Sequence, residues 1–198
     1  LCISATEDHL DMHLDFDSLK KVGAMIGSGG LVVMNDKSCM VEVARFFMNF
    51  TQNESCGKCV PCREGTKRML ELLTDITEGR GTMEHIEMLE ELAETISATA
   101  LCGLGKTAAS PVVSTLKYFR DEYIAHVVDK KCPAGQCKAL VNFKINPELC
   151  RGCTKCARMC PVGAITGTVK EPHVIDTDKC IKCGACKSGC SFNAVEEV

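Results

Sequence analysis

Apolar residues recur at helical spacing over residues 38–128. Positions at i, i+3, i+4 and i+7 lie on one face of a helix, so each run of this kind predicts an amphipathic helix. Ser38 is suited to cap the first helix, Gly79 ends the second, and Ser110-Pro111 opens the last. We expect the apolar faces to form the core of a helical bundle. They consist of Val43, Phe46, Phe47 and Phe50; Met69, Leu72, Leu73 and Ile76; Ile86, Leu89, Ala93 and Ile96; and Val112, Leu116, Phe119, Tyr123 and Val127.

Residues 1–37 show a mixed pattern. Leu31 to Met34 form a short apolar run after Gly27-Ser28-Gly29-Gly30, which predicts a strand entered through a tight turn. The glycine cluster could also cradle a phosphate, but it lacks the spacing of the known phosphate-binding loops. Since the chain begins with Leu1 rather than Met, we expect residues 1–37 to be the end of a preceding β-containing domain of a longer protein.

Residues 144–198 contain an internal repeat with a period of 30. Each copy has the pattern of a strand, a cysteine-rich loop, a short helix and a second strand. We expect a separate domain here, joined to the helical bundle by a linker over residues 129–143. The matching segments are Ile145–Cys150 with Ile175–Cys180, and Cys160–Ile165 with Cys190–Val195.

Cysteine accounts for 16 of the 198 residues, and most of these cysteines fall into three closely spaced groups. An iron–sulfur cluster needs four soft thiolate ligands, and cysteines separated by two residues on a curled loop supply three of them. Two zinc sites are an alternative for the last eight cysteines, and a secreted disulfide scaffold is an alternative for the whole set. The spacing and the helical core favour clusters in a reducing cytoplasm. The groups are Cys56, Cys59 and Cys62; Cys150, Cys153, Cys156 and Cys160; and Cys180, Cys183, Cys186 and Cys190.

The first group supplies three ligands and needs a fourth from elsewhere. Cys102 is the best candidate because it follows a predicted helix end, and the glycines at 103 and 105 allow close approach of the backbone to a cluster. A site of this kind would join two helical hairpins. Lys58 and Arg63 either offset the negative charge of the cluster or are solvated surface charges.

Charge and hydropathy narrow the class of protein further. The net charge is −3, so the chain lacks the excess of basic residues that is typical of nucleic-acid-binding proteins. No apolar run is long enough to span a bilayer. The first fifteen residues are acidic, unlike a secretory signal peptide. We therefore expect a cytoplasmic protein without a membrane span. No nucleophile–base pair is visible, so we assign no catalytic residue.

The repeated segment resembles a bacterial two-cluster ferredoxin. In that fold the fourth cysteine of each run binds the other cluster, and the resemblance implies the same exchange here. Ser191 stands where such runs usually carry proline, which alters the local turn but removes no ligand. The implied ligand sets are Cys150, Cys153, Cys156 and Cys190 for one cluster, and Cys180, Cys183, Cys186 and Cys160 for the other.

The helical region resembles the NADH-oxidising flavin subunit of respiratory complex I, downstream of its FMN domain. The resemblance is carried by the run from Gly27 to Arg63, which includes ESCGKC-x-PCR, and by the segment from Leu101 to Ala108. In that family this motif and a distal cysteine hold the 4Fe-4S cluster that accepts electrons from FMN.

A helical domain followed by a ferredoxin unit resembles the beta subunit of cytoplasmic NAD(P)-linked iron-only hydrogenases, including electron-bifurcating ones, and of some formate dehydrogenases. The resemblance implies FMN and NAD(P) sites upstream of Leu1 and none in this chain. It also implies a catalytic iron-only hydrogenase subunit and a small 2Fe-2S thioredoxin-like subunit as partners. Soluble ferredoxin is a further candidate partner.

Residues near the linker point to a metal of another kind. Cys132 and Cys137 straddle a turn, and His126 precedes them at the end of a long predicted helix. Zinc takes four nitrogen or sulfur ligands in a tetrahedron, and Cys2 is our candidate for the fourth. Free thiols and another cluster are the alternatives. Cys39 adjoins an apolar helical stretch and is expected in the core. Surface or polar-contact roles are expected for His9, His13, His85 and His173.

These patterns predict an α+β protein, in which a helical bundle carrying one 4Fe-4S cluster is followed by a two-cluster ferredoxin-like domain. The expected function is the electron-transfer portion of an NAD(P)H-linked flavin oxidoreductase subunit that serves a hydrogenase. The alternatives are a formate dehydrogenase beta subunit and a structural iron–sulfur module without a redox role.

Overall fold

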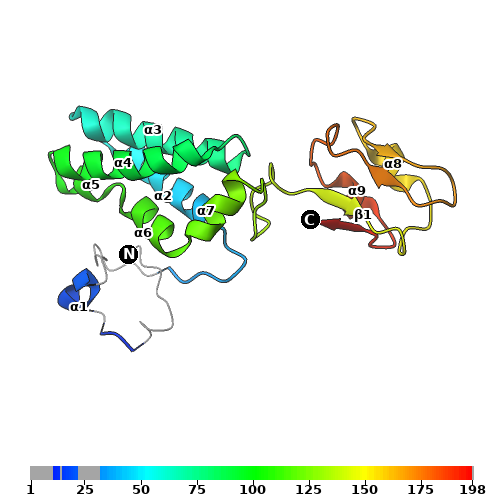
Figure 1. The fold of residues 1–198 in the computed structure, drawn as a ribbon, viewed down its shortest axis with the longest axis horizontal. Coiled ribbons are helices and arrows are strands. Elements are labelled where there is room, and N and C mark those ends of the chain that lie inside the picture. The colour runs from blue at the N-terminus through cyan, green and yellow to red at the C-terminus, as the bar shows by residue number, and fades with distance from the viewer. Residues whose placement is uncertain (1–10, 14, 22–31, 198) are drawn as a thin grey trace. The chain divides into compact units, whose positions relative to one another are not determined.

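The computed structural model describes residues 11–13, 15–21 and 32–197. The chain divides into two units, Leu1–Cys137 and Lys138–Val198 (Figure 1). The boundary falls inside the predicted linker, so Cys132 and Cys137 belong to the first unit. None of the helices within the described ranges has the length and apolar character needed to cross a membrane.

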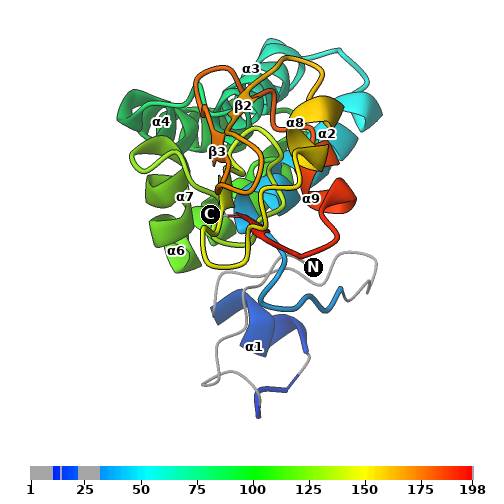
Figure 2. The same cartoon turned by 90° about the vertical axis from the view of Figure 1, so that its right-hand side faces the viewer.

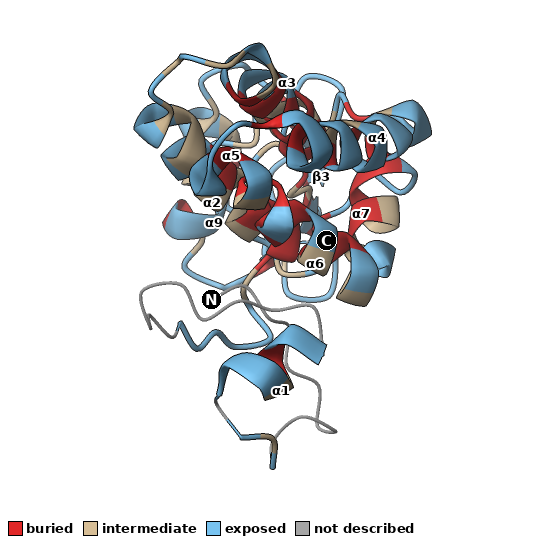
Figure 3. Ribbon diagram, turned by 90° about the vertical axis from the view of Figure 1, so that its left-hand side faces the viewer, coloured by how far each residue is buried: buried red, intermediate tan, exposed pale blue. Residues whose placement is uncertain are grey.

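The first unit is built from helices. In chain order they are α1 (Phe16–Lys21), α2 (Met40–Glu54), α3 (Val60–Thr77), α4 (Met83–Thr99), α5 (Gly103–Thr107), α6 (Ser110–Tyr118) and α7 (Arg120–Val127). Helix α3 packs against α2 and α4, and α6 also packs against α2 and α4. Figure 3 shows the buried residues gathered on the inner faces of these helices. The predicted helical bundle is therefore present.

Helices α3 and α4 bury the apolar stripes that the sequence predicts. Each of the eight stripe residues is at most 3% exposed. The two helices approach closely at Gly65, where a Cβ atom would lie 2.6 Å from Ile96 Cγ1. Because any side chain at Gly65 would push Ile96 away, glycine at this position allows the tight contact.

Helix α2 differs from its prediction. Cys39, not Ser38, is the N-cap residue, and its Sγ accepts a hydrogen bond from the Glu42 backbone N–H at 3.5 Å. Phe46 and Phe50, which were expected in the core, are 62% and 58% exposed. The core-facing side is formed by smaller side chains, which allow α2 to lie close to α3. Its buried residues are Met40, Val41, Ala44 and Met48.

The long helix predicted after Ser110 is divided in two. Helices α6 and α7 meet at Phe119, whose φ of −131° and ψ of 35° interrupt the helical backbone. The Thr115 and Tyr123 hydroxyl groups lie 2.8 Å apart across this break, and both side chains are buried. The break gives α7 its own direction and carries His126 into the interior, where it is fully buried.

The described part of residues 1–37 contains helix α1 and no strand. Residues 32–34 of the predicted strand are exposed and have no regular structure. That prediction is wrong for these three residues, because no neighbouring strand is available to pair with them among the residues described. Leu31 and the glycine cluster at 27–30 lie outside the described residues.

The second unit follows the internal repeat. Its elements in chain order are β1 (Phe143–Ile145), α8 (Lys155–Met159), β2 (Ile165–Thr166), β3 (Val174–Ile175), α9 (Ala185–Gly189) and β4 (Val195–Glu197). Strand β1 pairs antiparallel with β4, and β2 pairs antiparallel with β3. Each pair thus joins the first strand of one copy to the second strand of the other. Helices α8 and α9 lie side by side (Figures 1 and 2).

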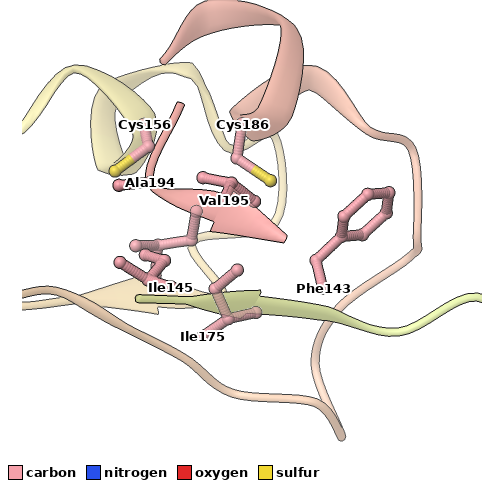
Figure 4. Packing of buried hydrophobic residues seen from close by; sticks show 8 residues of the cluster. Phe143, Ile145, Cys156, Ile175, Cys186, Ala194 and Val195 are labelled. Atoms are coloured by element: carbon pink, nitrogen blue, oxygen red, sulfur yellow. The ribbon is translucent and has the colours of Figure 1, made fainter. Parts of the chain in front are cut away.

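The core of the second unit lies between these strands and helices. Ile145 is opposite Val195, and Ile165 is opposite Ile175, which is the same pairing in the two copies. The Cys156 and Cys186 sulfur atoms point away from each other (Figure 4). The core therefore separates two cysteine loops. Its residues are Phe143, Ile145, Cys156, Ile165, Ile175, Cys186, Ala194 and Val195.

Candidate metal centres

Four cysteines of the helical unit line one hollow. Three come from the loop between α2 and α3 and from the first turn of α3. The fourth, Cys102, directly precedes α5. The structure therefore places Cys102 at the same hollow as the triplet predicted from the sequence. The lining residues are Glu54, Ser55, Cys56, Lys58, Cys59, Cys62, Cys102 and Leu104.

The loop that carries the triplet is held by Arg63. Its guanidinium Nη1 donates a hydrogen bond to the Gly57 carbonyl oxygen at 2.7 Å, and Gly57 has a φ of +72° that favours glycine. Arg63 also pairs with Glu64 at 2.9 Å. The sequence suggested either charge compensation or a surface role for Arg63, and the structure adds a bracing role for the loop.

Helix α5 reaches the same hollow through a close contact at Gly105. A Cβ atom at Gly105 would lie 2.6 Å from Ala100 Cβ and 3.6 Å from Cys62 Sγ. Backbone N–H groups of Leu101 and Cys62 lower the pKa of Cys59. Since the thiolate is the form that binds metal, these donors favour the ligand form of Cys59.

The cysteine loops of the second unit share an unusual backbone. Positions 152 and 182 have φ angles of +63° and +57°, and positions 154 and 184 have φ angles of +61° and +73°. Each pair is related by the repeat period of 30. Left-handed residues on either side of Cys153 and Cys183 curl each loop. This curl directs the cysteines of one run toward a common space.

Two hollows of the second unit each gather cysteines from both copies of the repeat. Three cysteines come from one run and the fourth from the other run, because the strands pair across the copies. This is the exchange that the ferredoxin resemblance implies. One hollow is lined by Cys150, Cys153, Cys156 and Cys190, and the other by Cys180, Cys183, Cys186 and Cys160.

Backbone donors point at the sulfur atoms that cross between the copies. The Ala164 N–H donates to Cys160 Sγ at 3.2 Å, and the Ala194 N–H donates to Cys190 Sγ at 3.4 Å. Donors of this kind stabilise negative charge on sulfur. Each of the three hollows thus presents four thiols to one space, which is the donor set that a 4Fe-4S cluster requires.

A fourth group of metal-binding side chains lies buried in the first unit. It consists of Cys39, His126, Cys132 and Cys137, whose ligand atoms all lie within 4.8 Å of one another. Cys39 Sγ is 3.8 Å from Cys137 Sγ, and His126 Nε2 is 3.3 Å and 3.4 Å from these two sulfur atoms. Two sulfurs bound tetrahedrally at 2.3 Å from zinc lie about 3.8 Å apart. The donor set and its spacing fit a zinc ion.

Glu122 positions two members of this group. Its backbone carbonyl lies 2.7 Å from His126 Nδ1, which leaves Nε2 facing the three sulfur atoms. Its side chain accepts a hydrogen bond from the Met40 N–H at 3.0 Å, directly after Cys39. An outer partner of this kind fixes the ring orientation of a ligating histidine. Burial raises the pKa of the Glu122 carboxyl group.

Two of the buried thiols, Cys39 and Cys137, differ strongly in their pKa values. A hydrogen bond from Cys137 lowers the pKa of Cys39 to about 4, with a further contribution from His126. The same hydrogen bond and burial raise the pKa of Cys137. The group therefore already favours one thiolate next to His126. Thiolate and imidazole are the ligands that zinc prefers.

In the structure the fourth member of this group is Cys39, whereas the sequence analysis proposed Cys2 as the fourth ligand. Cys39 was assigned to the apolar core, and it is buried at 1% exposure, but its sulfur faces the metal-binding group. Cys2, proposed for the fourth position, lies outside the described residues. Because Cys39 and His126 are 87 positions apart in the sequence, no local spacing could have linked them.

Comparisons with known families agree with both units. Residues 42–126 match the NADH-ubiquinone oxidoreductase-F iron–sulfur binding region, and residues 142–191 match the 4Fe-4S dicluster domain. Over 164 residues the chain is 52% identical to the NADP-reducing hydrogenase subunit HndC of Solidesulfovibrio fructosivorans. Over 134 residues it is 40% identical to the F subunit of NADH-quinone oxidoreductase in Streptomyces coelicolor. The chain is homologous to both proteins.

These homologues are longer than the chain. The HndC alignment covers 83% of this chain and 34% of HndC, and the alignment with the Streptomyces coelicolor protein covers 68% of this chain and 30% of that protein. The chain thus spans about a third of the curated relatives it matches. A structure of an NAD+-reducing [NiFe]-hydrogenase in the H2-reduced state also matches it. That match has a TM-score of 0.56 and 29% identity, and covers 62% of this chain and 20% of the hydrogenase chain.

Proposed function

We propose that this chain is the iron–sulfur portion of an NAD(P)H-linked flavin oxidoreductase subunit and that it carries three 4Fe-4S clusters. One observation carries the proposal: three separate hollows are each lined by four cysteines. Homology to HndC and to the F subunit of NADH-quinone oxidoreductase supports the same function.

The clusters would supply one-electron redox chemistry, and the chain would hold them. Cys56, Cys59, Cys62 and Cys102 would hold the bundle cluster. The two hollows of the second unit would hold the ferredoxin-type pair, with Cys160 and Cys190 exchanged between the runs. Backbone N–H groups at Ala164 and Ala194 would offset charge on the exchanged sulfur atoms.

The proposed partners follow from the resemblance to the beta subunit of NAD(P)-linked iron-only hydrogenases. A flavin domain upstream would bind FMN and NAD(P), and electrons would pass between that flavin and this chain. A catalytic iron-only hydrogenase subunit and a small 2Fe-2S thioredoxin-like subunit are the proposed neighbours in a cytoplasmic complex, with soluble ferredoxin as a further candidate. The hydrogenase is preferred to formate dehydrogenase because HndC is named as a hydrogenase subunit.

The buried Cys3His group would bind one structural zinc ion. Cys39 precedes α2, His126 lies on α7, and Cys132 and Cys137 lie in the segment that ends the first unit. One ion would therefore join three segments that are far apart in sequence. Since zinc has no redox chemistry, its role would be to stabilise the helical unit.

Electron uptake tests the proposed function directly. We expect the full chain, purified without oxygen and titrated with a low-potential reductant, to accept about three electrons, one for each cluster. EPR spectroscopy would follow the reduced clusters as they form. Bound iron with no electron uptake between about −700 and +450 mV would contradict an electron-transfer role and favour a structural module.

A further inference from the structure

Ser55 lies at the point where the chain leaves α2 for the cysteine loop of the bundle site. It is the C-cap residue of this helix, and its extended backbone, with a φ of −64° and a ψ of 125°, ends the helical course. Its side chain is half-buried and lines the same hollow as the cysteine triplet. A hydroxyl group therefore stands among the proposed cluster ligands.

The Ser55 hydroxyl has two hydrogen-bonding neighbours. Its Oγ lies 3.3 Å from Cys62 Sγ, and it accepts a hydrogen bond from the Gly57 backbone N–H at 3.3 Å. A serine hydroxyl has one proton to donate and lone pairs that accept. Since the Gly57 N–H uses a lone pair of the oxygen, the hydroxyl proton is free to point at the Cys62 sulfur. The bond from Gly57 also holds Oγ in place within the loop.

The direction of the bond between Ser55 and Cys62 follows from ligation. A free thiol could donate its own proton to the Ser55 oxygen. A cysteine that binds a cluster does so as the thiolate, which has no proton to donate. With a cluster bound, Cys62 can only accept, and the Ser55 hydroxyl is the donor.

The burial of Cys62 makes this hydrogen bond effective. Cys62 is 4% exposed, whereas Cys56 and Cys102 at the same hollow are exposed. Water competes little for a buried sulfur atom, and the low local dielectric strengthens a hydrogen bond there. Lys58 also lines the hollow, but it is exposed, so solvent screens its charge. Ser55 thus supplies a side-chain donor at the most deeply buried sulfur of this site.

We infer that Ser55 raises the reduction potential of the bundle cluster by donating a hydrogen bond to the sulfur of Cys62. Reduction adds negative charge to the cluster and its thiolates, so a donor at sulfur stabilises the reduced form more than the oxidised form. An electron would therefore rest more readily on the bundle cluster with Ser55 than without it. This inference rests on the proposed function.

Ser55→Ala removes the donor and is expected to lower the potential of the bundle cluster. At a fixed potential the ratio of reduced to oxidised bundle cluster should fall about tenfold, which corresponds to about 59 mV for a one-electron couple. The potentials of the two clusters in the second unit should not change, because Ser55 does not line their hollows. Ser55→Thr keeps a hydroxyl group and should keep the potential of the unmodified chain.

Thr66→Val is the matched control. The Thr66 hydroxyl donates to the backbone carbonyl oxygen of Cys62 at 2.6 Å, and the Thr66 side chain is fully buried. The variant removes a hydroxyl from the same ligand residue without removing a donor at sulfur. A general loosening of the site would lower the potential in this variant too, whereas the inference expects no change.

An anaerobic redox titration of the full chain, followed by EPR, measures these potentials, and the signal lost in Cys102→Ala identifies the bundle cluster. A bundle potential that does not fall in Ser55→Ala, or that falls equally in Thr66→Val, would overturn the inference. An unmodified chain that binds no cluster in the bundle would instead contradict the proposed function.

A second pair of variants decides the matter if Ser55→Ala fails to bind the bundle cluster. Ser55→Thr and Ser55→Val introduce side chains of similar shape that differ in the hydroxyl group. The inference expects the lower bundle potential in Ser55→Val. Equal potentials in the two variants would overturn it.

Discussion

Replacing Cys102 by alanine is expected to remove one of three clusters and leave the other two in place. Cys102 lies at the hollow of the triplet but comes from a different part of the bundle, directly before α5. Three remaining thiolates cannot complete the four-thiolate set of a 4Fe-4S cluster. Iron should fall from about twelve to about eight atoms per chain, or to about eleven if the cluster loses a single iron.

Cys190→Ala provides the matched control in the second unit. Cys190 belongs to the same run as Cys180, but it lies at the hollow of Cys150, Cys153 and Cys156. Its loss should therefore remove the cluster bound by Cys150, Cys153 and Cys156. The bundle cluster should remain, as EPR of the reduced variants would show. A Cys102→Ala variant with the iron content and spectrum of the unmodified chain would contradict the assignment of Cys102.

Replacing His126 by alanine is expected to release the zinc ion and to destabilise the helical unit strongly. The side chain is fully buried, and its Nε2 lies between two sulfur atoms. Metal bound only by the folded state stabilises it by about 4 kcal/mol when its free concentration is a thousandfold above Kd. Zinc analysis should fall from about one ion per chain to none, and the unfolding midpoint should fall with it.

Tyr123→Phe separates metal loss from general damage to α7. Tyr123 is buried one turn before His126, and its hydroxyl lies 2.8 Å from the Thr115 hydroxyl. Removing this hydroxyl should cost about 1 kcal/mol and leave zinc bound. A His126→Ala variant that retains zinc, or an unmodified chain that contains none, would rule out the proposed zinc site.

The cluster sites were predictable where ligands are close in sequence or related by the repeat. Three cysteines of each set lie within seven consecutive residues, and the exchange of Cys160 and Cys190 follows from the ferredoxin resemblance. The stripes of α3 and α4 were also predictable, since a periodic apolar face has one way to be buried. The role of Cys39 as the fourth member of the Cys3His group was not predictable, because its sulfur belongs to a helix N-cap residue and follows no ligand spacing.

Other differences arise from tertiary packing. Phe46 and Phe50 have helical spacing, but a competing face of smaller residues on the same helix, including Ala44, is the one that is buried. Helix propensity does not reveal the break at Phe119, where the Thr115 and Tyr123 side chains meet. His173 follows no motif, and only the folded chain places it at a cysteine-lined hollow.

The proposal of three clusters is tested most directly by counting iron and acid-labile sulfide in the full chain purified without oxygen. Twelve cysteines in three hollows predict about twelve of each per chain, four for every cluster. Zinc is counted separately in the same sample. About twelve iron and twelve sulfide would agree with three clusters, whereas about eight of each would contradict a cluster in the helical bundle.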